Sequence, residues 1–189
     1  MGAVFFRTLD VILALAGLLI TFPILLFVAL IGLFDTGSPI FLQERVGRNK
    51  KPFMLVKFRT MSVDTASVAS HLASSASITR MGGVLRKTKL DELPQLWNVL
   101  KGEMSLVGPR PGLFNQEELT AAREAKGVFS VRPGITGESQ VNEIDMSTPA
   151  LLAKVDAKMI SELSITNYFK FIIMTVAGKG SGDRVKTNS

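Results

Sequence analysis

The stretch "VILALAGLLITFPILLFVALIGLF", residues 11–34, decides how this chain is built. It contains no charged residue, and as one helix it would extend roughly 36 Å at about 1.5 Å per residue. Spanning the hydrocarbon core of a bilayer takes about 20 such residues. A soluble core helix of this length and uniformity is unusual, and no small-residue cleavage site follows it, as would be expected in a signal peptide. We therefore predict a membrane helix.

Charges on either side of this stretch predict where the rest of the chain lies. Arg7 and Asp10 precede the stretch and cancel each other. The residues just after it are strongly basic, with Asp35 and Glu44 against six basic residues: Arg45, Arg48, Lys50, Lys51, Lys57 and Arg59. Since basic segments stay on the cytoplasmic side of a membrane, the bulk of the protein is predicted to be cytoplasmic.

Pro23 lies in the middle of the stretch and removes one backbone donor, so it kinks or breaks the helix. Two topologies follow. In the first, a kinked helix spans the membrane and the N-terminus is outside. In the second, a re-entrant hairpin enters and leaves on the same side. Composition does not choose between them, because proline is tolerated in spanning helices.

Beyond residue 34 the patterns alternate between strands and helices. Residues 35–61 have the turn and strand signals of a β-hairpin, with Phe53 and Leu55 on one face. Residues 62–77 form a Ser/Ala-rich run, predicted to be a mobile loop or a weak helix.

Three helices are predicted in the C-terminal half. One begins at a capping box formed by Asn115 and Glu118 and ends at Gly127. A second is capped by Ser147 or Thr148, with Pro149 near its first position. The apolar segment 167–177 is too short to span a bilayer, so it is predicted in the core or at the membrane interface.

The composition narrows the chemistry. The 189 residues carry a net charge of +6, which suits anionic partners, and they contain no cysteine. The single histidine, His71, falls in the Ser/Ala-rich run, where a solvated loop residue is expected. Cysteine or histidine chemistry is thus disfavoured, and nucleic-acid binding is not predicted, because basic and aromatic residues do not alternate as in RNA-stacking modules.

The stretch "RKTKLDELPQLWNVLKG", residues 86–102, contains an adjacent acidic pair, Asp91 and Glu92. Asp91 could simply cap the helix that follows, with Glu92 and Pro94 in its first turn. Alternatively, a carboxylate kept ionised by the surrounding basic residues can attack phosphorus, and two carboxylates suit Mg²⁺. The two interpretations are compatible.

Two similar turns, "GPRPG" at 108–112 and "VRPGITG" at 131–137, each place an arginine before Pro-Gly. The proline holds Arg110 or Arg132 in an extended conformation, and the glycine allows a sharp turn. Guanidinium groups match phosphate oxygens bidentately. Either turn alone could be merely structural, but together with the acidic pair they predict a diphosphate site.

These blocks resemble a known family. "FLQERVGRNKKPFMLVKFRTM", "LRKTKLDELPQLWNVLKGEMSLVGPRPG" and "VRPGITGESQVN" are similar to the signature blocks of bacterial sugar transferases, the monotopic phosphoglycosyl transferases, in a minimal catalytic form. The resemblance covers most of residues 5–143. It implies transfer of a phospho-sugar from a UDP-sugar, of which an N-acetylated hexose is expected, to polyprenol (undecaprenyl) phosphate, with release of UMP.

The resemblance also implies roles for individual residues. Asp91 would attack the sugar-linked phosphate and carry a covalent intermediate, and Glu92 would help hold Mg²⁺, so both are predicted as the catalytic pair and as metal ligands. Substrate binding would fall to four residues: Arg86, Arg110, Arg132 and Thr136. The family's proline-broken helix maps onto Pro23 and favours the re-entrant hairpin.

The predicted fold is α+β and mostly helical, with a re-entrant membrane helix, a small β-hairpin, and interfacial amphipathic helices around a cytoplasmic catalytic core. Residues 1–36 would be embedded in the membrane, 37–178 would form the catalytic domain, and 179–189 a disordered tail. The expected location is the cytoplasmic face of the bacterial inner membrane, in contact with membrane lipid, and a homodimer is left open.

The sequence departs from the family at three places. Phe22 stands where similar proteins often have serine before the proline, and "ESQVNEID" follows "PGITG" where many of them have an apolar or aromatic residue. Tyr168 stands roughly where they have an acidic residue. Two other functions remain as alternatives. One is a one-step transferase in which Asp91 is only a metal ligand or base. The other is a non-catalytic, membrane-anchored module that binds anions.

Overall fold

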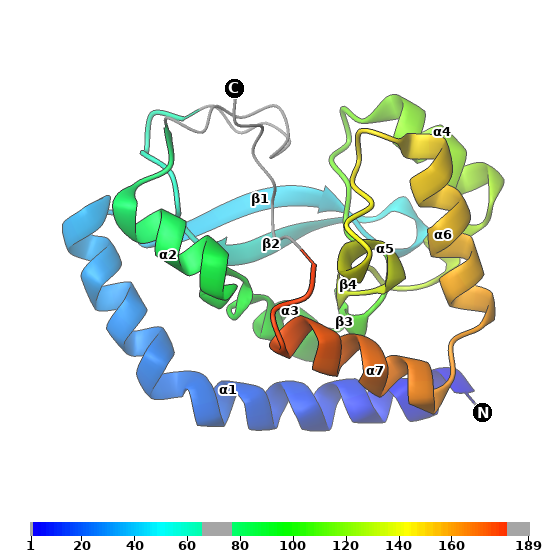
Figure 1. The fold of residues 1–189 in the computed structure, drawn as a ribbon, viewed down its shortest axis with the longest axis horizontal. Coiled ribbons are helices and arrows are strands. Elements are labelled where there is room, and N and C mark those ends of the chain that lie inside the picture. The colour runs from blue at the N-terminus through cyan, green and yellow to red at the C-terminus, as the bar shows by residue number, and fades with distance from the viewer. Residues whose placement is uncertain (1, 66–76, 181–189) are drawn as a thin grey trace.

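The computed structural model describes residues 2–65 and 77–180 (Figure 1). His71 lies outside these residues, as do most of the Ser/Ala-rich run and of the predicted tail. The N-terminal half contains the long helix, the hairpin and the turns around the acidic pair: α1 (Gly2–Asp35), β1 (Ile40–Val46), η1 (Arg48–Lys50), β2 (Pro52–Phe58), α2 (Arg80–Thr88), η4 (Leu90–Glu92) and α3 (Gln95–Lys101). The remainder consists of β3 (Ser105–Val107), α4 (Glu117–Ala125), η5 (Val128–Ser130), β4 (Gly134–Thr136), α5 (Glu138–Val141), α6 (Pro149–Ser161) and α7 (Ile165–Val176).

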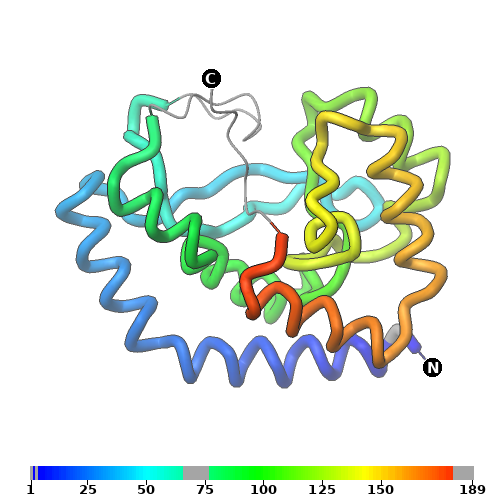
Figure 2. The backbone as a smooth tube through the Cα atoms, in the orientation of Figure 1, coloured from blue at the N-terminus to red at the C-terminus, as the bar shows by residue number. Residues whose placement is uncertain are grey.

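Helix α1 is the predicted apolar helix, and it is continuous over 34 residues. Figure 2 shows that it is bent, with the rest of the chain inside the angle of its two arms. Pro23 lies within it and supplies no backbone donor. The Thr21 hydroxyl donates to the Gly17 carbonyl oxygen at 2.7 Å, a bond that also bends helices. Phe22 has no hydroxyl, but its neighbour Thr21 supplies one that bonds to the helix backbone.

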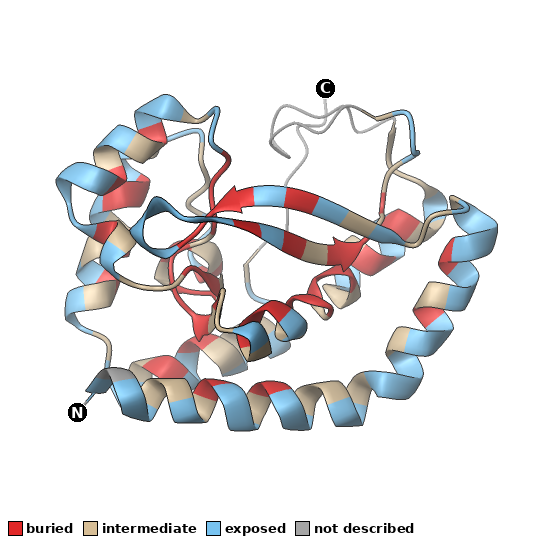
Figure 3. Cartoon of the chain, turned by 180° about the vertical axis from the view of Figure 1, so that it is seen from behind, coloured by how far each residue is buried: buried red, intermediate tan, exposed pale blue. Residues whose placement is uncertain are grey.

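Most of the surface of α1 is apolar and exposed. Its segment Val4–Asp35 has a mean hydropathy of 2.8 over an 18-residue window, of which only 11% is buried. Along the outer side of the helix the ribbon is coloured mainly as exposed (Figure 3). A core helix of a soluble protein would be mostly buried, so the exposure fits a helix that lies in lipid.

Both arms of α1 pack against the rest of the chain. The first arm contributes Ala14 to the main core, together with Phe53, Val99 and Tyr168. The second arm places Val28 in a smaller cluster with Phe58 and Leu85. The helix is therefore held by the domain along its length, rather than joined to it only at one end.

Polar contacts reinforce the packing of the first arm. Asp10 is buried, and its carboxylate accepts bonds from the Leu106 backbone N–H at 2.9 Å and from the Tyr168 hydroxyl at 2.8 Å. The same environment raises the pKa of Tyr168, first through burial and then through the charge of Asp10. Tyr168 thus joins α7 to α1.

The predicted hairpin is confirmed. Strands β1 and β2 pair antiparallel, with Gln43 opposite Leu55 and Arg45 opposite Phe53. Phe53 and Leu55 are buried on one face of β2, as the alternation predicted, and Lys57 is buried on the same face.

A second two-stranded sheet was not predicted. Strands β3 and β4 pair parallel, with Ser105 opposite Gly134 and Val107 opposite Thr136. Each is three residues long, too short to leave an alternating pattern in the sequence. The general prediction of a mostly helical α+β fold is confirmed.

The helix predictions hold with one correction. Helix α6 begins at Pro149 after Thr148, and α7 covers the apolar segment. The capping box at Asn115 is wrong, because α4 begins at Glu117 with Gln116 as its N-cap. The Gln116 side chain instead accepts a bond from the Leu113 N–H at 2.8 Å, which steadies the preceding turn.

Candidate active site

The acidic pair lies in a tight turn between two helices. Helix α2 ends at Thr88, and its C-cap residue Lys89 has a left-handed φ of 59°. This change of direction leads into the 3₁₀ turn η4 that holds Asp91 and Glu92. Strand β2 packs against η4. As a result Asp91 is 3% exposed and Glu92 is 8% exposed, which is unusual for carboxylates and requires compensating partners.

The interpretation of Asp91 as a helix cap is wrong. Pro94 is the N-cap residue of α3, and the backbone from Leu93 onward is already helical. The turn runs into α3 through i→i+3 bonds, such as that from the Leu96 N–H to the Leu93 carbonyl oxygen. The burial of Asp91 is therefore not explained by capping.

Arg110 is brought directly to the pair, as predicted. Its guanidinium donates to Glu92 Oε1 at 2.9 Å, in an ion pair that is largely shielded from solvent. The backbone of the Arg110 turn is held from behind by Arg123, which donates to the Arg110 carbonyl oxygen at 2.8 Å. Arg123 is itself buried and paired with Asp156 at 2.7 Å. A second charged pair thus fixes the arginine that touches Glu92.

Arg86 approaches from the last turn of α2, where its Nε donates to the Thr60 hydroxyl at 2.8 Å. The helix can come this close only because Gly82 has no side chain: a Cβ there would lie 2.0 Å from the Thr60 carbonyl oxygen. Arg86 is three residues before Lys89, in the same chain turn that leads to the acidic pair. Its predicted role in substrate binding stays a prediction.

The two Arg-Pro-Gly turns lie back to back. The Gly134 N–H donates to the Pro109 carbonyl oxygen at 2.9 Å, and the Gly108 N–H to that of Thr136 at 2.8 Å. A Cβ on Gly134 would lie only 2.0 Å from the Gly108 nitrogen. Glycine is therefore required by the close approach of two backbones, which the sequence motif alone did not reveal.

Arg132 has different neighbours from Arg110. Its Nε donates to the Gly102 carbonyl oxygen at 2.7 Å, just after α3. Its side chain lines a cavity that it shares with Arg7 and Arg48, whereas Glu92 lines another. The two turns are therefore adjacent, but their arginines contact different residues.

Glu92 lies at the edge of a pocket of about 460 Å³ that is mainly apolar. The pocket is bounded by α1, η4, α3, the β3–β4 pair and α7. Its polar residues are Thr21, Thr88, Lys89, Glu92, Thr136 and Thr175. Thr136, a predicted substrate residue, is buried there, with its hydroxyl 2.5 Å from that of Thr175. The pocket thus joins a charged end to an apolar wall formed in part by the membrane helix.

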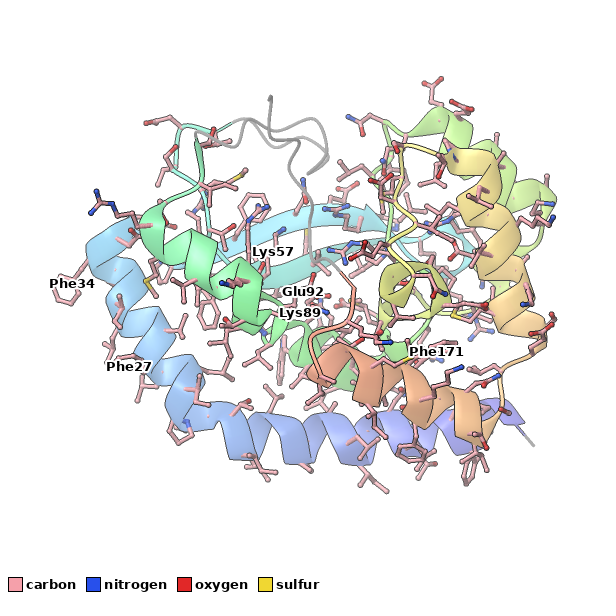
Figure 4. All side chains as sticks on the ribbon, viewed as in Figure 1. Phe27, Phe34, Lys57, Lys89, Glu92 and Phe171 are labelled. Carbon is pink, nitrogen blue, oxygen red and sulfur yellow. The ribbon has the colours of Figure 1, made fainter. Side chains whose placement is uncertain are left out.

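Lys89 was not predicted as a site residue, although it was counted among the basic residues around the acidic pair. In Figure 4 it lies beside Glu92, with Lys57 of β2 nearby. Burial lowers the pKa of the Lys89 ammonium below its usual value, while the charge of Glu92 acts in the opposite direction. Lys89 reaches the pocket because its backbone is left-handed, and this conformation is not apparent from the sequence.

The structure also indicates which residues could bind a metal ion such as Mg²⁺. Within residues 2–65 and 77–180, no group of three or more acidic or histidine side chains is close enough to hold an ion. Mg²⁺ often has only one or two protein carboxylates, and takes its other ligands from water and substrate phosphate. The adjacent carboxylates Asp91 and Glu92 fit this kind of site.

These features define a class: a membrane-associated protein with a buried site of carboxylates and basic residues. The chain belongs to the bacterial sugar transferase family, whose model matches residues 1–179.

Three relatives show the extent of the similarity. The chain is 38% identical over 184 residues to the exopolysaccharide production protein PSS of Rhizobium leguminosarum bv. phaseoli, and the match covers 92% of this chain and 90% of the relative. It is 36% identical over 182 residues to the UDP-glucose:undecaprenyl-phosphate glucose-1-phosphate transferase of Caulobacter vibrioides, covering 90% of this chain and 67% of the relative. An uncharacterized sugar transferase of Haemophilus influenzae is 40% identical over 163 residues, covering 75% of this chain but only 34% of the relative.

Proposed function

We propose that the protein is a phosphoglycosyl transferase that moves a sugar 1-phosphate from a UDP-sugar to polyprenol phosphate and releases UMP. The observation that carries this proposal is the buried pair Asp91 and Glu92. Glu92 forms an ion pair with Arg110 and also lines the mainly apolar pocket. Family membership and the named activity of the Caulobacter relative support it. The reaction would begin the assembly of a bacterial glycan on a lipid carrier.

In the first step, an Asp91 carboxylate oxygen attacks the phosphorus that is linked to the sugar. The bond from this phosphorus to the bridging oxygen breaks, and UMP leaves with the electron pair. The phospho-sugar then remains on Asp91 as an acyl phosphate. Buried Asp91 is suited to this role because a desolvated carboxylate has no water shell to lose before it attacks.

Arg110 and Arg86 would bind the diphosphate oxygens in this step, since guanidinium groups match them in shape and charge. Glu92 and Arg110 hold each other in place, so the arginine is oriented before the substrate arrives. Mg²⁺, when bound at Asp91 and Glu92, would stabilise the charge that develops on the phosphate. We propose no role for Arg132 at the acidic pair, because it faces another cavity.

In the second step, a phosphate oxygen of the lipid attacks the same phosphorus and the bond to Asp91 breaks. This gives the lipid diphosphate sugar and restores the carboxylate. We propose that the pocket beside Glu92 admits the lipid acceptor, with its first isoprene units on Leu13, Leu96 and Ile172. Lys89 would draw its phosphate toward the acidic pair, and Thr136 would line the passage.

The topology we propose is the re-entrant one, with both ends of α1 on the cytoplasmic face of the inner membrane. The support is that both ends contact the same domain: Arg7 donates to the Val99 carbonyl oxygen at 2.7 Å, and Asp35 accepts from the Thr79 hydroxyl at 2.7 Å. A straight spanning helix would separate these ends by the bilayer thickness. A single cysteine at Gly2 in this cysteine-free chain tests the proposal, since labelling from the periplasmic side would exclude it.

The predicted N-acetylated hexose stays a prediction, and so does the homodimer. Assaying UMP release with a panel of UDP-hexoses and UDP-N-acetylhexosamines would identify the donor.

A radiolabelled UDP-sugar supplied with Mg²⁺ and no lipid tests the mechanism. Wild-type protein should become labelled and release one UMP per chain, whereas Asp91→Asn should do neither. Labelling that persists in Asp91→Asn would remove the nucleophile assignment. UMP release that strictly requires lipid would instead favour the one-step alternative. If Asp91→Asn left the cellular function intact, the non-catalytic alternative would be supported.

A further inference from the structure

A second cavity, of about 480 Å³, opens at the other end of the first arm of α1. Three arginines from three separate segments line it: Arg7 from α1, Arg48 from the hairpin turn η1, and Arg132 from the second Arg-Pro-Gly turn. Its other lining residues, all from the start of α1, are Val4, Thr8, Val11 and Ile12. It shares no lining residue with the pocket beside Glu92, as far as the described chain shows.

The end of α3 explains part of this arrangement. Arg7 donates to the carbonyl oxygens of Val99 and Leu100 at 2.7 and 3.1 Å, and Arg132 donates to that of Gly102 at 2.7 Å. A helix C-terminus attracts cations in this way. These bonds use three N–H groups, whereas two guanidinium groups carry ten in all, at five each. The carbonyls therefore hold the arginines without exhausting their donors.

Helix capping does not account for the third arginine. Arg48 is exposed in the turn between β1 and β2, yet it lines the same cavity. Burial lowers the pKa of the Arg132 guanidinium, and the charges of Arg7 and Arg48 lower it further. Asp10 acts in the opposite direction, but its carboxylate is already bonded to Leu106 and Tyr168. An anion between the three arginines would relieve their mutual repulsion.

The rest of the lining shows what kind of anion fits. Val4 is 76% exposed, Val11 37% and Ile12 57%, and they continue the exposed apolar surface of α1. A ligand in this cavity therefore meets three cations at one end and a lipid-facing surface along its side. A water-soluble phosphate would satisfy only the first of these, whereas an amphiphile would satisfy both.

We propose that this cavity binds the phosphate headgroup of an anionic glycerophospholipid, with Arg7, Arg48 and Arg132 around the phosphate and the acyl chains along Val11 and Ile12. Such a lipid would fix the depth and tilt of the first arm of α1 in the membrane. The inference does not depend on the transfer reaction, and it gives Arg132 a ligand other than the sugar nucleotide.

Native mass spectrometry of the full chain in a neutral detergent tests the proposal. Phosphatidylglycerol and phosphatidylcholine with the same acyl chains are added at equal concentrations, and the lipid adducts are counted. We expect one phosphatidylglycerol per chain and a clear preference over phosphatidylcholine. Equal adducts of both lipids would overturn the proposal.

Arg48→Gln should reduce the affinity for phosphatidylglycerol roughly fivefold, the effect expected for one basic residue at an anionic lipid. Arg48→Lys should retain most of the affinity. Lys51→Gln is the matched control, because it removes one charge from the same turn without touching the cavity; it should change the affinity by less than about twofold. An equal loss in both glutamine variants would show general attraction to anionic surfaces and overturn the site.

Competition separates a lipid from a soluble phosphate. Inorganic phosphate or UMP, added at tenfold excess over phosphatidylglycerol, should leave the lipid adduct in place. Displacement by either would overturn the lipid assignment, and Arg132 would then be assigned to substrate binding. Since Arg48 lies outside the proposed active site, Arg48→Gln should also keep the melting temperature and the rate of UMP release of the wild type in neutral detergent.

Discussion

The two Arg-Pro-Gly turns share a local sequence and pack directly against each other, yet their arginines have opposite surroundings. Arg110 faces a carboxylate, Glu92, and its backbone is supported by the buried Arg123–Asp156 pair. Arg132 faces a backbone carbonyl and two further arginines. The motif fixes the backbone of each turn, whereas the partner of each arginine is set by segments far away in the sequence. We expect the first turn to serve catalysis and the second to serve attachment to lipid.

The largest effect should come from separating the two turns. Gly134→Ala would place a Cβ 2.0 Å from the Gly108 nitrogen, and neither backbone can move without breaking the β3–β4 pair. We expect a loss of at least about 4 kcal/mol in the free energy of unfolding, measured by denaturant titration. Gly83→Ala is the control, because a Cβ there meets no atom within 4 Å and the residue is helical; it should be neutral or slightly stabilising.

The next effect concerns the support of the Arg110 turn alone. Asp156 is fully buried and paired with Arg123, so Asp156→Asn would leave a buried guanidinium without its counter-charge. Unfolding free energy should fall by about 3 kcal/mol. UMP release should fall more steeply than lipid binding at Arg48, because only the first turn loses its support. Equal loss of both functions would mean that the turns do not act separately.

Replacing Arg110 or Arg132 alone should have a smaller effect than the two substitutions above, and it acts on catalysis rather than on the free energy of unfolding. Arg110→Gln should lower kcat by about a hundredfold, the usual cost of losing one group that stabilises developing charge. Arg132→Gln should lower kcat less than about tenfold, because that residue lies away from the acidic pair. Steady-state UMP release measures both. If Arg132→Gln proved as damaging as Arg110→Gln with folding intact, the proposed division of roles would be wrong.

The smallest predicted effect is a pH dependence. Burial lowers the pKa of Lys89, so it loses its charge at a lower pH than an exposed lysine would. The KM for polyprenol phosphate should therefore rise as pH increases toward 10, by roughly five- to tenfold. Lys89→Arg should remove this rise, because a guanidinium stays charged. The exposed Lys87 gives a control: Lys87→Arg should leave the pH profile unchanged.

The sequence predicted those features that depend on local pattern. The apolar helix and the hairpin with Phe53 and Leu55 buried are confirmed. The ion pair of Glu92 with Arg110 agrees with a site that includes both residues, whereas their roles stay predictions. Periodicity and composition carry this information because each element needs a particular spacing of apolar residues.

Features that depend on long-range packing escaped prediction. Strands β3 and β4 are too short to show a pattern, and their pairing brings together residues about 29 positions apart, as Ser105 and Gly134 show. Asp10 would not be expected to be buried beside an apolar stretch, and its partners Ser105, Leu106 and Tyr168, about 100 to 160 residues away, explain it. Likewise Arg132 could not be separated from Arg110 without knowing that Arg7 and Arg48 reach the same cavity.

In the proposed mechanism Asp91 becomes covalently bonded to the phospho-sugar, and mapping the adduct on the protein shows whether this bond forms. Protein mixed with a UDP-sugar and Mg²⁺ but no lipid is quenched in acid and digested with trypsin, which cuts after Lys89 and Lys101 and releases residues 90–101. We expect this peptide to gain the mass of one sugar phosphate and fragmentation to locate that mass on Asp91. An adduct on Glu92 or on another peptide, or UMP release without any adduct, would contradict it.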